Sequence, residues 1–198
     1  HETTTFELTV TAAAAATLNA TLQLVSDDGD ENPFDLPLTA EVTALPQTHI
    51  IDNGDAGFTA TSGFLLYSQS GRDGDVHYVD VAPETPLATA SWKFTGLADG
   101  QYQVAATWTV ASSRPSNAPF TVQDANGVVL AEVAINQKLM PNDFESEGSN
   151  WETLATVDIL DGELEVLLTN QADNRWVIAD AVRIEKIGEV VLLSLIHI

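Results

Sequence analysis

The sequence predicts an all-β protein built as a jelly-roll type of β-sandwich, and three observations support the all-β prediction. Short segments of alternating polar and apolar residues recur, turn-forming clusters such as ADGQ, DANG and LDGE separate them, and helical periodicity is almost absent. The clearest alternation is QYQVAATWTV, in which every second residue from Tyr102 to Val110 is apolar. Because side chains alternate between the two faces of a strand, this pattern predicts one buried face.

Three strands are predicted in the first part of the chain, at residues 6–10, 18–24 and 36–42. The Ala-rich stretch 11–18 has no amphipathic stripe, and we expect it to connect two strands rather than to form a helix. Three strands are too few to close a sandwich, so we expect them to be the last strands of a domain that begins outside this chain. The segment ALPQ, residues 44–47, is expected to be a linker.

Nine further strands are predicted from residue 48 onward, at the spacing that is typical of a β-sandwich. They are expected at residues 48–51, 76–81, 88–94, 101–110, 118–123, 128–135, 154–159, 164–169 and 176–187. Trp92 and Trp108 fall on the apolar faces of two of these strands, so both are expected in the core.

The charge balance excludes two classes of partner. The 198 residues include 29 Asp and Glu but only 7 Lys and Arg, which gives a formal net charge of −22. Nucleic acid and anionic membrane surfaces are therefore not expected as partners, because both are bound through basic side chains. The chain has no cysteine, so disulfides do not stabilise it. Its first residues, HETTTFELTV, lack the pattern of a signal peptide.

The chain ends in an uncharged segment, residues 190–198. Nine residues are too few for membrane insertion, which takes about 20 in a helix. The last six, LSLIHI, resemble the translation of a sequencing-library adapter, CTG-TCT-CTT-ATA-CAC-ATC. We therefore expect residues 189–198 to be a non-native tail, and the chain to be a fragment of a longer protein.

No catalytic site is predicted in this chain. It has no nucleophile elbow, phosphate loop, dinucleotide fingerprint or zinc-ligand spacing. Of the four histidines, only His49 and His77 lie in predicted strands, where a lone histidine is most often structural. A catalytic domain elsewhere in a parent protein is compatible with this prediction.

Three Asp-rich loops, DDGDEN, DNGDAG and RDGDVHY, offer hard oxygen ligands that could bind calcium. The middle loop is the best candidate, with Asp52 and Asp55 as ligands. None of the loops matches the calcium-loop consensus that ends in a bidentate Glu, and a solvated turn explains the same residues. The sequence favours the solvated turn, with calcium as the alternative and no other cofactor.

Two tryptophans and one carboxylate stand out in the second half of the chain. Trp151 and Trp176 lie beside the polar segments EGSN and ADNR, so both could be partly exposed and stack on sugar rings. Asp180 is in phase with Ile178 and Val182, on a face that should be apolar. A buried carboxylate needs partners, so we expect Asp180 to have a structural role and to accept hydrogen bonds from loop amides or an Arg.

Several segments together resemble a known family. They are THIIDNGDAGFTATSG, DVHYVDV, ATASWKFTGLADGQYQVAATWTV, SNAPFTV, VAINQ, NWETLATVDI and VIADAVRIEKI. Residues 47–187, which contain these segments, resemble the golvesin C-terminal-like domain, also called the golvesin/xanthan-lyase carbohydrate-binding-like domain. One block departs from the pattern: after SGFLLYSQSG, Phe64 and Tyr67 stand where the family has a Trp-rich strand.

The resemblance implies an extracellular jelly-roll β-sandwich of the kind that is appended to secreted bacterial enzymes and large surface proteins. It also implies polysaccharide or another cell-surface polymer as the partner, with Tyr67, Trp151 and Trp176 as the candidate contacts. The preceding segment, ATLQLVSDDGDENPFDLPLTAEV, is similar to the closing strands of an immunoglobulin-like repeat of the choice-of-anchor or cilia-associated type.

The predicted organisation is a truncated immunoglobulin-like domain at residues 1–44, a golvesin-like sandwich at residues 45–188, and the tail at residues 189–198. The favoured hypothesis is a non-catalytic accessory module of a secreted multidomain protein that binds polysaccharide and contacts neighbouring domains. The alternative is a structural spacer or adhesion-stalk module with no small ligand. The two hypotheses differ in whether an aromatic-lined cleft exists.

Overall fold

A computed structural model describes residues 16–24, 34–42, 47–82 and 87–188. The chain divides into two units, His1–Leu45 and Pro46–Ile198. The regular structure in the described ranges is β-strand, apart from η1 (Arg72–Gly74), a single turn of 3-10 helix. No helix among these residues is long and apolar enough to cross a bilayer.

The first unit contains a two-stranded antiparallel sheet. β1 (Ala16–Leu24) pairs with β2 (Phe34–Val42) in continuous register, from Ala16 opposite Val42 to Leu24 opposite Phe34. The expectation that residues 16–18 connect two strands is wrong, because β1 already begins at Ala16. The strand predicted at residues 6–10 lies outside the described residues. One hairpin does not establish an immunoglobulin-like domain, so that assignment stays a prediction.

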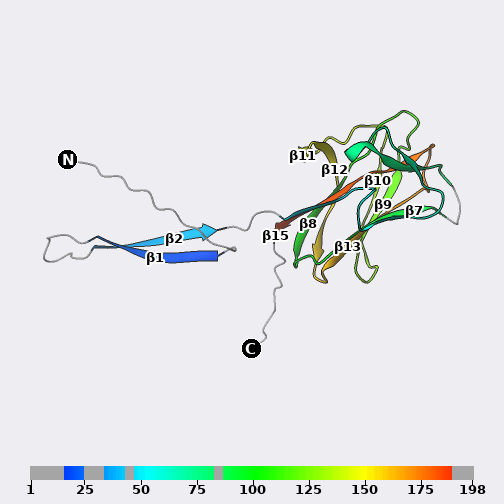
Figure 1. Ribbon diagram of the computed structural model, residues 1–198. Helices are drawn as coiled ribbons and strands as arrows, with labels where there is room; N and C mark the ends of the chain where they lie inside the picture. Colours follow the sequence, from blue (N-terminus) through cyan, green and yellow to red (C-terminus); the bar gives the residue numbers. More distant parts are fainter. Residues whose placement is uncertain (1–15, 25–33, 43–46, 83–86, 189–198) are drawn as a thin grey trace. The chain divides into compact units, whose positions relative to one another are not determined.

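The second unit contains two five-stranded antiparallel sheets (Figure 1). One has the order β10-β9-β13-β7-β4 and consists of β4 (Phe58–Ala60), β7 (Thr89–Thr95), β9 (Ala118–Asp124), β10 (Val129–Ile135) and β13 (Glu163–Thr169). The other has the order β11-β12-β8-β15-β3 and consists of β3 (Thr48–Ile51), β8 (Gly100–Ala106), β11 (Phe144–Ser146), β12 (Ser149–Ile159) and β15 (Val182–Gly188).

The two sheets share one apolar core, as the period-two pattern predicts. Both contribute buried side chains to a single cluster that includes Trp92 of β7 and Tyr102 of β8. Trp92 and Trp108 are 1% and 5% exposed, so their predicted place in the core is confirmed. The prediction for Val110 is wrong: β8 ends at Ala106, and Val110 is 42% exposed. Removal of so much apolar surface from water is the main source of stability in such a sandwich.

The outer face of the second sheet carries a smaller apolar cluster. Trp151 of β12, Ala105 of β8 and Ala181 are buried there, and Ile50 and Phe144 pack against them. The register of β12 against β8 shifts between Thr153 and Ala155, which marks a β-bulge. Because of the bulge, Trp151 belongs to this outer cluster although Val157, six residues later on the same strand, belongs to the main core.

A third sheet has the order β14-β6-β5 and consists of β5 (Leu65–Tyr67), β6 (Val76–Val79) and β14 (Val177–Ala179). The single strand predicted at residues 176–187 is therefore wrong as a continuous element. The chain breaks at Asp180 and Ala181, and β14 and β15 belong to different sheets. The short strands β4, β5 and β11 were not predicted.

Candidate functional site

The three-stranded sheet carries a hollow of about 310 Å³. Three of its lining residues are aromatic, two are aliphatic and one is cationic: Tyr67, Tyr78, Trp176, Val76, Ile178 and Arg114. Among the described residues that line it, none is Asp or Glu. A concave, mainly apolar surface with a few polar groups is the usual form of a small-ligand site.

The register of the strands explains why these side chains converge. Val76 and Tyr78 are two residues apart on β6, so both point to the same face of the sheet. Tyr67 of β5 lies opposite Val76, and Ile178 of β14 lies opposite Tyr78. Cross-strand partners share a face, so one side of the sheet presents two tyrosine rings and two aliphatic side chains to the hollow.

Trp176 immediately precedes β14 and is held by its neighbours. Its ring meets the ring of Tyr78 edge to face, with 6.4 Å between centroids and 79° between planes. The Arg175 guanidinium lies 5.2 Å from the centroid of the Trp176 ring, and it also pairs with Asp80 at 3.5 Å. The backbone of Trp176 has φ of 63°, a left-handed conformation that is uncommon for a bulky residue and is often found at functional sites.

Two loops are joined beside the hollow, one carrying Arg114 and the other carrying Trp176. The Asp173 carboxylate accepts hydrogen bonds from the Ser116 amide at 2.8 Å and from the Ser116 hydroxyl. The Asn174 side-chain amide donates to the Arg114 carbonyl at 3.3 Å. The bonds from Ser116 lower the pKa of Asp173, because they favour its charged form. These bonds position the rim of the hollow.

The far edge of β14 is held by Gln137, the glutamine of the VAINQ segment. Gln137 is fully buried, and its side-chain amide bonds to both the amide and the carbonyl of Ile178. Its own backbone amide donates to the Pro115 carbonyl at 3.0 Å, next to Arg114. Gln137 therefore supports both the strand and the loop that line the hollow.

The predicted carbohydrate contacts have different positions in the structure. Tyr67, 45% exposed, and Trp176, half-buried, both line the hollow although they are far apart in sequence. Trp151 does not: it is fully buried, and its indole N–H donates to the Ser146 carbonyl at 2.9 Å. The expectation that Trp151 is partly exposed is wrong, because it packs in the outer cluster with Phe144 of β11.

Four contributors to the hollow were not singled out from the sequence: Val76, Tyr78, Ile178 and Arg114. Tyr78 and Ile178 alternate correctly within predicted strands, but the sequence does not tell which face a third sheet leaves open. Arg114 lies in a loop with no motif of its own. His49 and His77 are not among the residues that line the hollow.

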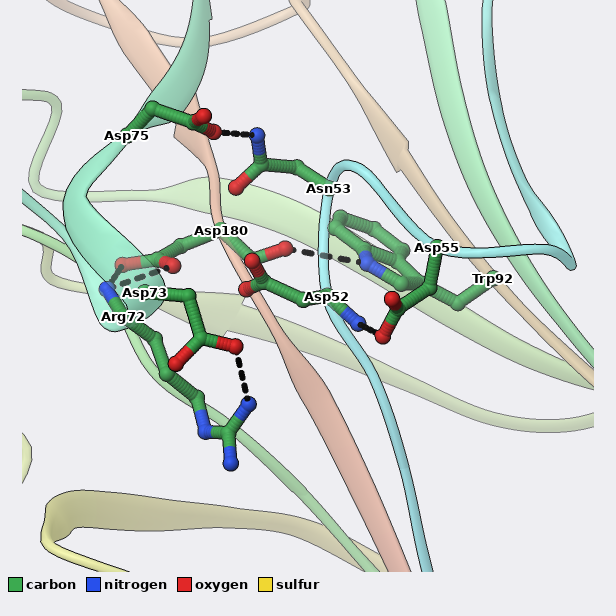
Figure 2. A network of polar contacts seen from close by, with 8 residues as sticks. All are labelled: Asp52, Asn53, Asp55, Arg72, Asp73, Asp75, Trp92 and Asp180. Carbon is green, nitrogen blue, oxygen red and sulfur yellow. Dashed lines mark hydrogen bonds and ion pairs between the residues drawn. The ribbon is translucent and has the colours of Figure 1, made fainter. Parts of the chain in front are cut away.

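A polar cluster, separate from the aromatic hollow, lies at the end of β3, where the chain enters the DNGDAG loop. β3 pairs with β15 through Ile51 opposite Val182, so Asp52 and Asn53 adjoin the break between β14 and β15 that contains Asp180. The exposed fractions of Asp52, Asn53 and Asp180 are 5%, 2% and 2%. In Figure 2, the Asp52 carboxylate points toward Asp180.

Asp180 is held in place largely through backbone groups. The Arg72 amide donates to its two carboxylate oxygens at 3.1 and 3.3 Å, and the Trp92 indole donates to its carbonyl at 3.1 Å (Figure 2). This agrees with the expectation of a buried carboxylate bonded to a loop amide. The Arg72 guanidinium instead pairs with Asp73 at 3.1 Å.

Burial governs the protonation of this cluster. Loss of solvation raises the pKa of Asp180 to about 8, and the neighbouring Asp52 carboxyl adds to the rise, although the Arg72 amide opposes it. Burial likewise raises the pKa of Asp52 to about 6, with a further contribution from the charge of Asp73. The two buried carboxyl groups therefore resist simultaneous ionisation.

The predicted calcium pair, Asp52 and Asp55, is only partly brought together. Asp55 is exposed, and its carboxylate closes the turn by accepting from the Asp52 amide at 2.9 Å. In Figure 2 it lies on the other side of the turn from Asp180. Within the described part of the chain, no group of three His, Cys, Asp or Glu side chains has the arrangement of a metal site.

Comparison with known proteins gives one family and a set of similar folds. The profile of the Golvesin C-terminal domain family matches residues 49–186. A xanthan lyase from Paenibacillus is similar in structure, with a TM-score of 0.58 and 22% sequence identity. That match covers 82% of this chain and 15% of the lyase chain, and at this identity it shows the fold alone. No curated protein sequence matches significantly.

Two smaller structures are more distant. The C-terminal CBM6 of the laminarinase LamC from Zobellia galactanivorans has a TM-score of 0.46 and 16% identity, covering 71% of this chain and 100% of that one. The CBM35 of Abf62 from Cellvibrio japonicus has a TM-score of 0.46 and 12% identity, covering 73% of this chain and 95% of that one.

The fold and the family agree with the sequence-based expectations of a β-sandwich and of a golvesin-like domain. The all-β sandwich is confirmed by the two facing sheets and by the likeness to the lyase. The family profile begins within β3 and ends within β15, so it spans nearly all of the segments that carry the resemblance. Because the family profile matches more than half of the chain, the chain belongs to the Golvesin C-terminal domain family.

Proposed function

We propose that this domain is a non-catalytic module that binds a polysaccharide in the aromatic hollow. The observation that carries the proposal is the convergence of Tyr67, Tyr78 and Trp176 around a space of about 310 Å³. Sugar rings present C–H faces that stack on aromatic rings, and their hydroxyl groups need polar partners at the rim. Arg114 and the Tyr67 hydroxyl supply such partners.

The charge of the protein favours a neutral polysaccharide. A formal net charge of −22 repels polyanions, and one guanidinium in the hollow does not reverse that field. A neutral glycan meets no such barrier and can still accept hydrogen bonds from Arg114. We therefore take neutral β- and α-glucans, mannans and xylans as the ligand class.

The composition of the hollow supports a binding role rather than catalysis. Hydrolysis of a glycosidic bond ordinarily uses two carboxyl groups on either side of the bond. Among the described residues that line the hollow there is neither Asp nor Glu, and neither internal histidine lies in it. Such modules act beside catalytic or adhesive domains, so we place the parent protein outside the cell.

A structural spacer is the second candidate function. Three of the four tryptophans are buried, and Arg175 lies over the ring of the fourth, Trp176. In this case the covered apolar hollow would stabilise the edge of the sandwich and bind no ligand. The two candidates differ in whether Trp176 is available to a ligand.

The test is affinity electrophoresis and titration calorimetry of the full chain against soluble neutral glycans, with polyanionic glycans as a second arm. We expect saturable binding of a neutral glycan, weakened at least tenfold by Trp176→Ala and by Tyr67→Ala. Leu139→Ala is the matched control, because Leu139 is 63% exposed and does not line the hollow. Absence of binding to every glycan, or equal binding by all variants, would refute the proposal and leave the spacer.

A further inference from the structure

The buried polar cluster at Asp52, Asn53 and Asp180 is separate from the aromatic hollow, and the proposed function does not use it. It holds more acceptors than donors. The side-chain oxygens Oδ1 of Asp52 and Oδ1 of Asn53 are buried and have no hydrogen-bond partner. The Asp52 and Asp180 carboxyl groups lie within hydrogen-bonding reach, so either a proton held between them or a cation must bridge their oxygens.

The surrounding groups supply only part of the missing positive charge: the charge of Arg72 acts to lower the pKa of both carboxyl groups, but burial outweighs it. Arg72 approaches Asp180 with its backbone amide, while its guanidinium pairs with Asp73. The Asn53 side-chain nitrogen is already committed to Asp75 and lies 3.2 Å from Nδ1 of His77. A buried acceptor without a partner is costly, so this arrangement favours a cation among the oxygens.

We propose that Asp52, Asn53 and Asp180 bind a calcium ion. The three side chains offer two carboxylates and one amide oxygen, which are hard ligands of the type that calcium prefers. Calcium takes six to eight oxygens in an irregular shell, so backbone carbonyls and waters complete the set. The proposed site therefore does not require a group of three His, Cys, Asp or Glu side chains, and none is found among the described residues.

The donor set also selects calcium over other divalent ions. Magnesium demands a nearly regular octahedron at short distances, which a strand end and a strand break do not provide. Zinc is bound chiefly by nitrogen and sulfur, and the nearby nitrogen, Nδ1 of His77, lies against the Asn53 amide nitrogen rather than the carboxylates.

A route for the ion exists from the surface. Asp180 and Arg72 border a second hollow of about 390 Å³, whose other lining residues include Thr107, Thr109, Pro141 and Asn150. This hollow allows an ion to reach the carboxylate without unfolding of the sandwich.

The experiment uses the full chain, freed of metal with EDTA and returned to chelator-free buffer with about 0.15 M salt to screen its negative surface. Terbium luminescence excited through tryptophan is the first readout, because the Trp92 indole bonds to the Asp180 carbonyl. Displacement of terbium by calcium, and calorimetry with calcium alone, give the stoichiometry. We expect one ion per chain with a dissociation constant of about 1 mM or below, as in extracellular modules.

Three isosteric variants locate the site. Asp52→Asn and Asp180→Asn should each weaken calcium binding at least tenfold, whereas Asp55→Asn should change it less than about twofold. In EDTA, the first two variants should unfold at a temperature no lower than the wild type, since each removes a buried repulsion. If calcium up to about 10 mM shows no saturable one-to-one binding, or if all three variants bind equally, the proposal is overturned.

Discussion

The Gln137 side chain pairs with the Ile178 backbone as a neighbouring strand would. Its Nε2 donates to the Ile178 carbonyl at 2.8 Å, and its Oε1 accepts from the Ile178 amide at 2.9 Å. β14 is the edge of the three-stranded sheet, so these two backbone groups have no strand partner on that side. One buried side chain thus replaces a segment of sheet.

Gln137→Ala should therefore destabilise the domain strongly. The substitution leaves a buried amide and a buried carbonyl of Ile178 unpaired, and each such group costs about 1–3 kcal/mol. We expect the free energy of unfolding to fall by roughly 2–4 kcal/mol, measured by urea denaturation. Gln101→Ala is the control, because Gln101 is exposed; equal losses for the two variants would contradict the prediction.

Gly71→Ala should also be costly, for a steric reason. Gly71 has φ of 109°, and a Cβ there would lie 2.2 Å from the Asp75 carbonyl oxygen. We expect a loss of at least about 2 kcal/mol, since both backbone strain and a clash are introduced. Gly74→Ala separates the two effects: φ is 99°, but nothing lies within 4 Å of the added Cβ. If Gly74→Ala costs as much in the same urea titrations, the clash is not the cause.

Acid should loosen the rim of the aromatic hollow through Asp173. Hydrogen bonds from Ser116 depress the pKa of Asp173 in the folded state. A depressed pKa contributes stability that is present above the unfolded value, about 3.9 for Asp, and is lost as pH falls through the folded value. The melting temperature of Asp173→Asn should therefore fall less than that of the wild type between about pH 5 and pH 3.

The control for this acid effect is Asp99→Asn, which removes an exposed carboxylate elsewhere. Melting temperatures of the three proteins are measured across the same pH range by circular dichroism. Asp99→Asn should follow the wild type. Parallel curves for wild type and Asp173→Asn would show that the bonds to Ser116 do not contribute.

Trp151→Ala should destabilise the fold without removing a ligand contact. Trp151 is fully buried in the outer cluster with Ala105 and Ala181, so truncation leaves a large cavity. We expect a loss of about 3–5 kcal/mol, measured by urea denaturation. Below the unfolding transition, its glycan affinity should equal that of the wild type. A selective loss of affinity in the folded protein would place Trp151 in the binding site after all.

Sequence periodicity predicts the main sheets well because their faces differ. Tyr102 and Val104 are buried as the alternation requires, since one face of β8 meets the core. The pattern fails for Val110, which continues the alternation after the strand has ended at Ala106. Apolar alternation marks the face of a strand, but hydrogen bonding decides its length.

The candidate sites depend on contacts that no local pattern contains. Asp180 is recognisable as a buried carboxylate, but its partner Arg72 is 108 residues away in the sequence. Tyr67 and Trp176 line the same hollow because β5, β6 and β14 form a separate sheet. Trp151 was expected near the surface because the hairpin of β11 that covers it was not predicted.

The break between β14 and β15 places the two proposed sites on one short piece of chain. Ile178 lines the aromatic hollow, and Asp180, two residues later, belongs to the acidic cluster. Arg72, which bonds to Asp180, likewise precedes β6 and its Val76 and Tyr78. If the two proposed sites are coupled through this junction, calcium would strengthen polysaccharide binding, and by thermodynamic reciprocity the polysaccharide would raise the affinity for calcium by the same factor. In a calcium-rich exterior such a module would hold its polymer, and on loss of the ion it would release it.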